Sequence, residues 1–256
     1  MENEIATLAT LVFAAIFAGF IDSVVGGGGL IQIPALFTVL PQYPPATLFG
    51  TNKFASVLGT TNAAWRYAQR VDMPWRTTLP AAVAAFTCSY LGAMAVAWLP
   101  RELLRPLILV LLVSAAIYTF LKKEFGAVHG PSHGGRRELA YAIALGGVIG
   151  FYDGFFGPGT GSFLIFLFIR FFGFDFLHAS AAAKVVNVAT NLAALAYFAP
   201  NGNLLWQVAI LMALGNVGGS LAGTHLALKH GSGFVRQVFL VVVSLLILKF
   251  AWDTFR

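Results

Sequence analysis

The chain has 256 residues, of which 58% are hydrophobic and only 10% are charged, and its mean hydropathy is +0.80. A soluble domain carries about a quarter charged residues, so this composition excludes an ordinary soluble protein and predicts one that lies in a lipid bilayer. Apolar stretches of about 20 residues, the span of a bilayer core, use up the chain and leave no room for a soluble domain. The net charge of +6 says little about partners, because the cytoplasmic loops of membrane proteins are generally basic.

The first half contains four long apolar runs and one short run. In chain order they cover about 5–21, 30–40, 47–65, 77–98 and 103–121. The short run has too few residues to cross a bilayer as a helix, which predicts a re-entrant or broken element. It follows the glycine cluster from Gly26 to Gly29. Because non-helical backbone at membrane depth is tolerated only inside protein or beside water, we expect this cluster to face a cavity.

The second half repeats this order. At an offset of 131 residues the chain aligns with itself without a gap, and the coincident residues include the rare pairs Asp22 with Asp153 and Lys53 with Lys184. A second short run, 162–172, follows a second glycine cluster from Gly157 to Gly161. The sequence therefore predicts two homologous transmembrane repeats joined by a cytoplasmic linker, with bounds at 1–128, 129–138 and 139–256.

Basic residues in the loops predict that the two halves are inverted relative to each other. The loop 66–76 holds three arginines, whereas its counterpart 198–207 holds no charge. Because basic loops lie on the cytoplasmic side, we expect the first loop inside and the second outside. Arg101 and Arg105 are the exception, since this orientation puts them outside. The expected fold is an all-α polytopic membrane protein, an inverted repeat of two five-element halves that each contain a glycine-broken short helix.

Lys53 and Lys184 share one repeat position, and each lies about 9 Å inside a predicted long helix at 1.5 Å per residue. A charge within a bilayer is costly and marks a functional site by default, although a lysine this near a helix end also reaches the interface by snorkelling. The duplication favours function. One cation with hydrogen-bonding neighbours in each half suits a small oxyanion. Those neighbours follow the lysines at i+3 and i+7, and they are Ser56, Thr60, Asn187 and Asn191.

The glycine clusters offer an anion free backbone N–H groups and the positive end of a half-helix. Broken helices at matching positions indicate a transporter's binding site, although close helix packing also selects glycine. Asp22 and Asp153 precede the clusters by four residues, and they either couple transport to a proton or cation or hold the loops by hydrogen bonds. The expected loop contacts with substrate are Gly27, Gly28, Gly29, Gly159, Thr160 and Gly161.

The remaining reactive residue types carry no site in this interpretation. A single cysteine, Cys88, excludes an internal disulfide, and its repeat partner is Gly219 in a row of small residues that predicts helix contact rather than redox chemistry. We expect no metal site and no cofactor, because the linker and loop histidines show no recognisable ligand spacing. Those histidines are His129, His133, His225 and His230.

The stretch from Gly19 to Gly29, the motif Gly50-Thr51-Asn52-Lys53 and their echoes in the second half resemble the TauE/SafE sulfite exporter family over essentially the whole chain. The resemblance implies a multi-pass carrier in a bacterial or archaeal cytoplasmic (inner) membrane for sulfite or organosulfonates, or for thiosulfate in relatives with cysteines along the path. It also points to Asn52 as a substrate contact. Ala183 stands in place of Asn52 in the second half, so the two sites need not be chemically equal.

We therefore expect an exporter of small sulfur-containing anions that works by alternating access around a midplane site between the repeats. Its partners are the bilayer and the anion and not nucleic acid, while proton or cation coupling and a homo-oligomer stay open. The alternatives are an anion channel and a carrier for a non-sulfur organic anion. An intramembrane Ser–His enzyme built on Ser162 and His225 is disfavoured, because it leaves the duplicated lysines unexplained.

Overall fold

The computed structural model describes residues 2–96, 126, 129–130 and 135–255, and the elements in this part of the chain are all helices. The all-α fold class is confirmed. The expected run at 103–121, Arg101, Arg105 and His133 lie outside the described residues. In chain order the helices are α1 (Glu2–Val25), α2 (Gly29–Val39), α3 (Pro45–Ala68), α4 (Trp75–Ala95), α6 (Arg136–Phe155), α7 (Thr160–Phe172), α8 (Phe176–Phe198) and α9 (Trp206–Phe255).

The helix lengths are those of a multi-pass membrane protein with two short inserts. Helices α2 and α7 have 11 and 13 residues, so they extend only about 16–20 Å and cannot cross a core of about 30 Å. Both short elements predicted from the apolar runs are therefore confirmed. Four described segments are long and apolar enough to cross a membrane, namely Ala6–Val25, Trp75–Ala95, Phe176–Phe198 and Trp206–Leu245.

Helix α9 consists of two helices joined at Gly231. This glycine has φ 70° and ψ −163°, a conformation that breaks the helix and favours glycine over residues with a side chain. The break divides α9 into 206–230, which corresponds by the repeat to α4, and 232–255. The second half therefore presents the expected order of a long, a short and three further long helices.

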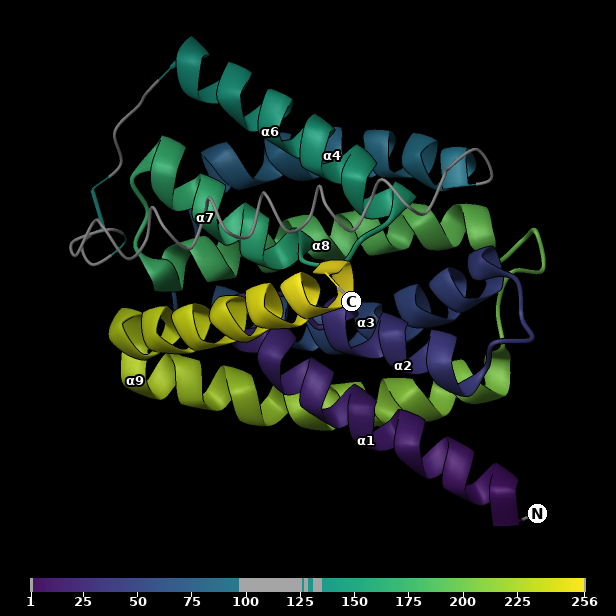
Figure 1. Ribbon diagram of the computed structural model, residues 1–256. Coiled ribbons are helices and arrows are strands. Elements are labelled where there is room, and N and C mark those ends of the chain that lie inside the picture. Colours follow the sequence, from purple (N-terminus) through teal and green to yellow (C-terminus); the bar gives the residue numbers. More distant parts are fainter. Residues whose placement is uncertain (1, 97–125, 127–128, 131–134, 256) are drawn as a thin grey trace.

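Helices of one half pack against helices of the other half (Figure 1). Helix α1 lies along α9, and α4 lies along α6, while α3 and α8 pack against each other between these two pairs. By the repeat, α6 corresponds to α1 and the first part of α9 corresponds to α4. Each outer pair thus joins the first element of one half to the fourth element of the other. The inverted orientation of the halves and the bounds of the two repeats stay predictions.

Glycines allow the outer helices to touch backbone to backbone. A Cβ atom on Gly219 would lie 1.8 Å from the carbonyl oxygen of Ile16 on α1, a distance that no side chain tolerates. The sequence predicted this row of small residues as a helix contact, and that prediction is confirmed. The glycines of α9 that face α1 are Gly215, Gly219 and Gly223.

The surface carries many large apolar side chains, and the interior buries polar side chains together with an apolar core. Large apolar side chains such as Phe13, Val148 and Leu214 are exposed, as befits a surface that contacts lipid chains. Polar side chains are instead buried at the centre, where backbone and side-chain groups must find partners within the protein. The centre, which α3, α8 and the two glycine loops surround, is therefore the place to look for a site.

Candidate functional site

The two glycine loops meet at the centre of the molecule. Between α1 and α2, Gly26 and Gly27 have φ values of 72° and 97°, which favour glycine. A Cβ on Gly26 would lie 2.3 Å from the backbone carbon of Gly161 in the other half. The Ser162 hydroxyl then fastens the loops together by donating to the carbonyl of Val25 at 3.0 Å. The loops of the two halves are thus in direct backbone contact.

Both short helices begin at this meeting point. Local hydrogen bonds shape the second loop, since the Tyr152 hydroxyl donates to the carbonyl of Pro158 at 2.6 Å and the Thr160 hydroxyl donates to the carbonyl of Gly157 at 2.8 Å. Thr160 opens α7, and Gly29 opens α2. The N-termini of α2 and α7, with their positive dipole ends and free N–H groups, therefore point at one central region.

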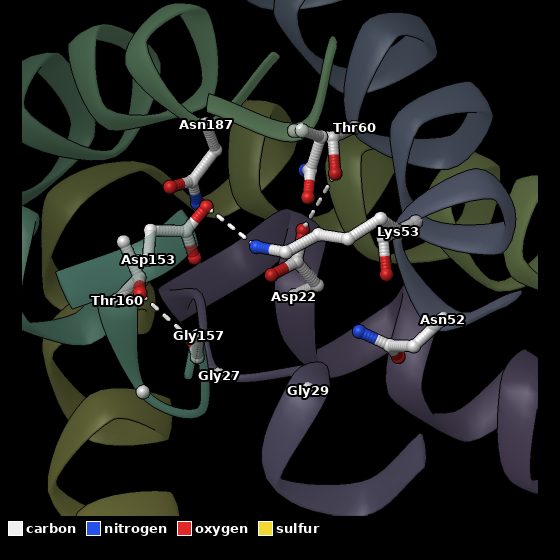
Figure 2. A pocket seen from close by; sticks show the side chains of 14 residues that line it. Asp22, Gly27, Gly29, Asn52, Lys53, Thr60, Asp153, Gly157, Thr160 and Asn187 are labelled. Carbon is white, nitrogen blue, oxygen red and sulfur yellow. Dashed lines mark hydrogen bonds and ion pairs between the residues drawn. The ribbon is translucent and has the colours of Figure 1, made fainter. Parts of the chain in front are cut away.

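Each of the two lysines ends in an ion pair with an aspartate of the opposite half. Lys53 Nζ lies 2.6 Å from Asp153 Oδ2, and Lys184 Nζ lies 3.5 Å from Asp22 Oδ2. Figure 2 shows the Lys53 ammonium group turned toward the Asp153 carboxylate. Lys53 is 3% exposed and Lys184 is 0% exposed, so neither side chain snorkels to a membrane interface. Isolated charges are very costly at such positions, whereas paired charges persist. The repeat therefore appears in the site as two crossed ion pairs.

The two ion pairs are unequal. Lys53 donates a hydrogen bond to Asp153, whereas Lys184 Nζ has no hydrogen-bond acceptor among the described residues, although Asp22 lies within ion-pair distance. Asp22 instead accepts from the Thr60 hydroxyl at 3.1 Å and from the Gly28 N–H at 3.4 Å. An ammonium group carries three donors. Lys184 therefore keeps unused hydrogen-bonding capacity next to Asp22.

A small cavity lies between the loops, α3 and α8. Its volume is about 30 Å³, and one water needs at least roughly 10–15 Å³, so it has room for water but not for an organosulfonate. All but two of the predicted site residues line it, and Figure 2 shows most of them around the Lys53 ammonium group. The predicted residues in the lining are Asp22, Gly27, Gly29, Asn52, Lys53, Ser56, Thr60, Asp153, Gly159, Thr160, Gly161, Asn187 and Asn191.

Lys184 and Gly28 are the two predicted residues that do not line the cavity. Both contact Asp22, which does line it. Lys184 therefore reaches the cavity only through Asp22, while Lys53 lies at its wall. Gly157 also lines the cavity. The sequence placed Gly157 in the glycine break but not in the site, and the repeat gave no signal for it, because its repeat partner Gly26 was not a predicted site residue either.

Two amides at the cavity have unused acceptor atoms. Asn52 Oδ1 and Asn187 Oδ1 are buried without a hydrogen-bond partner in the described part of the protein, and both residues line the cavity. A buried polar atom without a partner costs about 1–3 kcal/mol. Because the two ends of an amide look alike in shape, turning either group over would present its NH₂ donors to an anion. The cavity thus combines one lysine, two carboxylates, three amides and two helix N-termini.

Comparison with known proteins identifies the family. Residues 11–250 match the family model described as sulfite exporter TauE/SafE. The chain belongs to the TauE/SafE family. This result confirms the resemblance found in the glycine and Gly50–Lys53 motifs, and it places the chain in a transporter family and not in an enzyme family.

Bacterial relatives align with the TauE/SafE chain over nearly its full length. A probable membrane transporter protein ORF9 from Sinorhizobium sp is 37% identical over 93% of this chain and 89% of its own length. The probable membrane transporter protein YfcA of Escherichia coli K12 is 32% identical, over 96% of this chain and 90% of its own. A probable membrane transporter protein of Haemophilus influenzae is 30% identical, over 99% and 98%. No solved structure gives a significant match.

Proposed function

We propose that this membrane transporter exports small sulfur-containing anions, such as sulfite or organosulfonates, from a binding site between its two halves. The observation that carries the proposal is the pair of crossed ion pairs at the cavity, Lys53 with Asp153 and Lys184 with Asp22. They supply buried cations for an anion and carboxylates that hold those cations while no anion is bound. The family's description as a sulfite exporter supports the choice of sulfur-containing anions.

Charge balance makes a proton the natural companion of the anion. Two lysines and two aspartates give the closed site no net charge, so an anion that enters alone would leave an uncompensated buried negative charge, which is costly. Protonation of one aspartate restores neutrality and frees its lysine for the anion. We assign this role to Asp22, because Lys184 does not hydrogen-bond to it and because its side chain is 15% exposed against 6% for Asp153.

The small cavity implies that binding and movement are linked. A cavity of about 30 Å³ cannot hold a sulfonate, so the halves must separate at the glycine loops before the anion enters. An inverted repeat would provide two equivalent ways to open, one toward each side of the membrane, which is alternating access around a fixed site. The N-termini of α2 and α7 would contact the anion in both openings.

The substrate class is tested by binding to the purified protein. Sulfite, a small alkylsulfonate, acetate and phosphate are compared by their stabilisation against thermal unfolding and by titration calorimetry. We expect the two sulfur anions to bind most tightly. Tighter binding of acetate or phosphate would instead support a carrier of non-sulfur anions.

The site is tested by replacing each lysine with methionine, which keeps length and removes charge. A charge-assisted hydrogen bond contributes about 1.5–3 kcal/mol, so Lys53→Met and Lys184→Met should each weaken binding by one to two orders of magnitude. Lys184→Arg should bind the anion more tightly than Lys184→Met but less tightly than the native protein, because a planar guanidinium replaces a compact ammonium. Lys229→Met, at an exposed position of α9, is the matched control and should bind normally. Unchanged affinity in both cavity variants would place the anion site elsewhere.

A further inference from the structure

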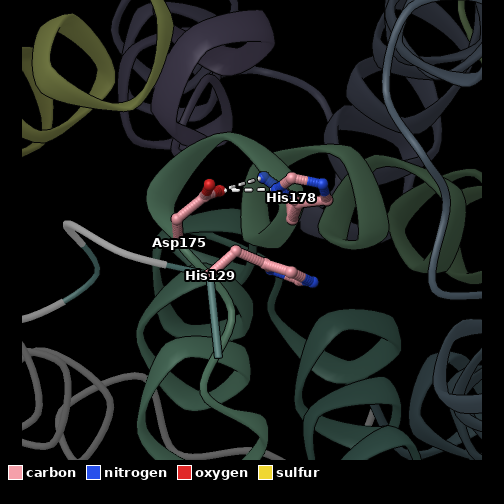
Figure 3. Close-up of side chains that lie close together, drawn as sticks. All are labelled: His129, Asp175 and His178. Atoms are coloured by element: carbon pink, nitrogen blue, oxygen red, sulfur yellow. Dashed lines mark hydrogen bonds and ion pairs between the residues drawn. The ribbon is translucent and has the colours of Figure 1, made fainter. Parts of the chain in front are cut away.

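A second group of titratable side chains lies away from the cavity, where α8 begins (Figure 3). His129 comes from the linker, Asp175 directly precedes α8, and His178 lies in the first turn of that helix. Each residue offers one potential metal-ligand atom, and these atoms all lie within 4.8 Å of one another. The spacing along the chain gave no sign of this cluster, because the linker and the start of α8 are brought together only by the fold.

Backbone hydrogen bonds hold the linker in place beside α8. The Phe176 N–H donates to the carbonyl of Gly126 at 3.0 Å, and the Gly130 N–H donates to the carbonyl of Gly173 at 2.9 Å. Along the chain, Gly126 and Gly130 lie on either side of His129, and Gly173 and Phe176 lie on either side of Asp175. The ring of His129 stacks on the ring of His178 with centroids 3.9 Å apart. The two histidines are thus held together by backbone contacts that do not depend on their side chains.

The hydrogen bonds at the cluster are incomplete. Asp175 Oδ1 caps α8 by accepting the His178 N–H at 2.8 Å, and the same oxygen lies 2.8 Å from His178 Nδ1. Nδ1 of His129 is buried and has no partner among the described residues. A buried ring nitrogen without a partner points to a ligand that would complete the group.

The titratable groups of the cluster influence one another. Burial and the neighbouring His178 lower the pKa of His129. Burial alone would raise the pKa of Asp175, but the hydrogen bonds from His178 outweigh it and lower that pKa.

We propose that His129, Asp175 and His178 form a binding site for a divalent transition-metal ion of the Zn²⁺ class. Two imidazoles and one carboxylate, with a water in the fourth position, are an established ligand set for Zn²⁺. The ion replaces the proton shared between Asp175 and His178 and takes a ring nitrogen of His129 as its third ligand. Ligand atoms around tetrahedral zinc lie about 3.4 Å apart, so the Asp175–His178 pair must open from its 2.8 Å contact and the stacked rings must turn toward the ion. The ion then clamps the linker to α8, the helix that carries Lys184.

The experiment measures zinc bound to the full-length protein in detergent after removal of any affinity tag. The protein is equilibrated with micromolar Zn²⁺, freed of excess ion and analysed for metal, and Co²⁺ is used in parallel because its absorption reports tetrahedral ligands. We expect about one ion per chain, loss of that ion in His129→Ala and in His178→Ala, and retention in His230→Ala. His230 is an exposed histidine of α9 and serves as the matched control.

A second readout separates a metal site from a helix cap. His129 does not cap α8, so without zinc His129→Ala should unfold only slightly below the native protein, through the loss of its ring stacking, and it should lose the whole increase in unfolding temperature that zinc causes. A native protein that retains no zinc, or a His129→Ala variant that retains as much as the native protein, would overturn the proposal and leave Asp175 as a helix cap alone.

Discussion

Removal of one charge from the Lys53–Asp153 pair should destabilise the protein more than removal of both charges. Both residues are buried, and Nζ lies 2.6 Å from Oδ2. Lys53→Met leaves the Asp153 carboxylate without a counter-ion, and loss of one partner of a buried pair costs about 3–5 kcal/mol. Asp153→Asn strands the ammonium group at a similar cost. The double variant contains neither charge, so it should recover most of the lost stability and give a coupling energy of a few kcal/mol.

The four proteins of this double-mutant cycle are compared by denaturant or thermal unfolding in one detergent at neutral pH. The cycle for Lys184 and Asp22 provides the internal comparison. Its separation is 3.5 Å and it lacks a hydrogen bond from Lys184, so its coupling should be smaller. The reasoning is refuted if either single variant of the Lys53–Asp153 pair is as stable as the native protein, or if the two losses simply add in the double variant.

Three further predictions concern the loops, the topology and the start of α8. Gly26→Ala should abolish folded protein in size-exclusion chromatography, because its Cβ would lie 2.3 Å from the opposite loop, whereas Gly218→Ala has nothing within 4 Å and should behave normally. In a background without the native cysteine, Arg70→Cys should be labelled only from the cytoplasm and Asn201→Cys only from outside; labelling of both from one side would rule out the inverted repeat. Because the pKa of Asp175 is lowered, its contribution to stability is present above about pH 4 and lost as pH falls further, so Asp175→Ala should lower the unfolding temperature at pH 7 and converge with the native protein in acid.

The sequence predicted the helices well because a bilayer permits few backbone structures. A run of about 20 apolar residues indicates a span, and 30–40 and 162–172 were too short to cross a bilayer, as α2 and α7 show. The glycine clusters predicted the breaks for the same reason, since unpaired backbone in lipid needs a cavity beside it. The break at Gly231 falls between the fourth and fifth elements that the repeat predicted for the second half, although the sequence did not single out this glycine, because glycine is also common inside membrane helices.

The site was predicted as a set of residues but not as a set of contacts. The repeat marked Lys53 and Lys184 as equivalent, yet it could not show that each would pair with an aspartate of the opposite half, because that depends on how α3 and α8 pack against the other half's loop. It also treated the two lysines alike, whereas Lys53 lines the cavity and Lys184 lies behind Asp22. Small differences in packing, invisible to an alignment, create this asymmetry.

We infer that an anion enters a neutral site together with a proton taken up by Asp22. An alkylsulfonate carries no proton of its own at neutral pH, so its binding to the purified protein in weakly buffered solution reports the protein's proton directly. We predict uptake of about one proton per sulfonate bound, and we predict that Asp22→Asn binds the same sulfonate without proton uptake. Sulfonate binding by the native protein with no change in pH, or undiminished proton uptake by Asp22→Asn, would contradict this inference.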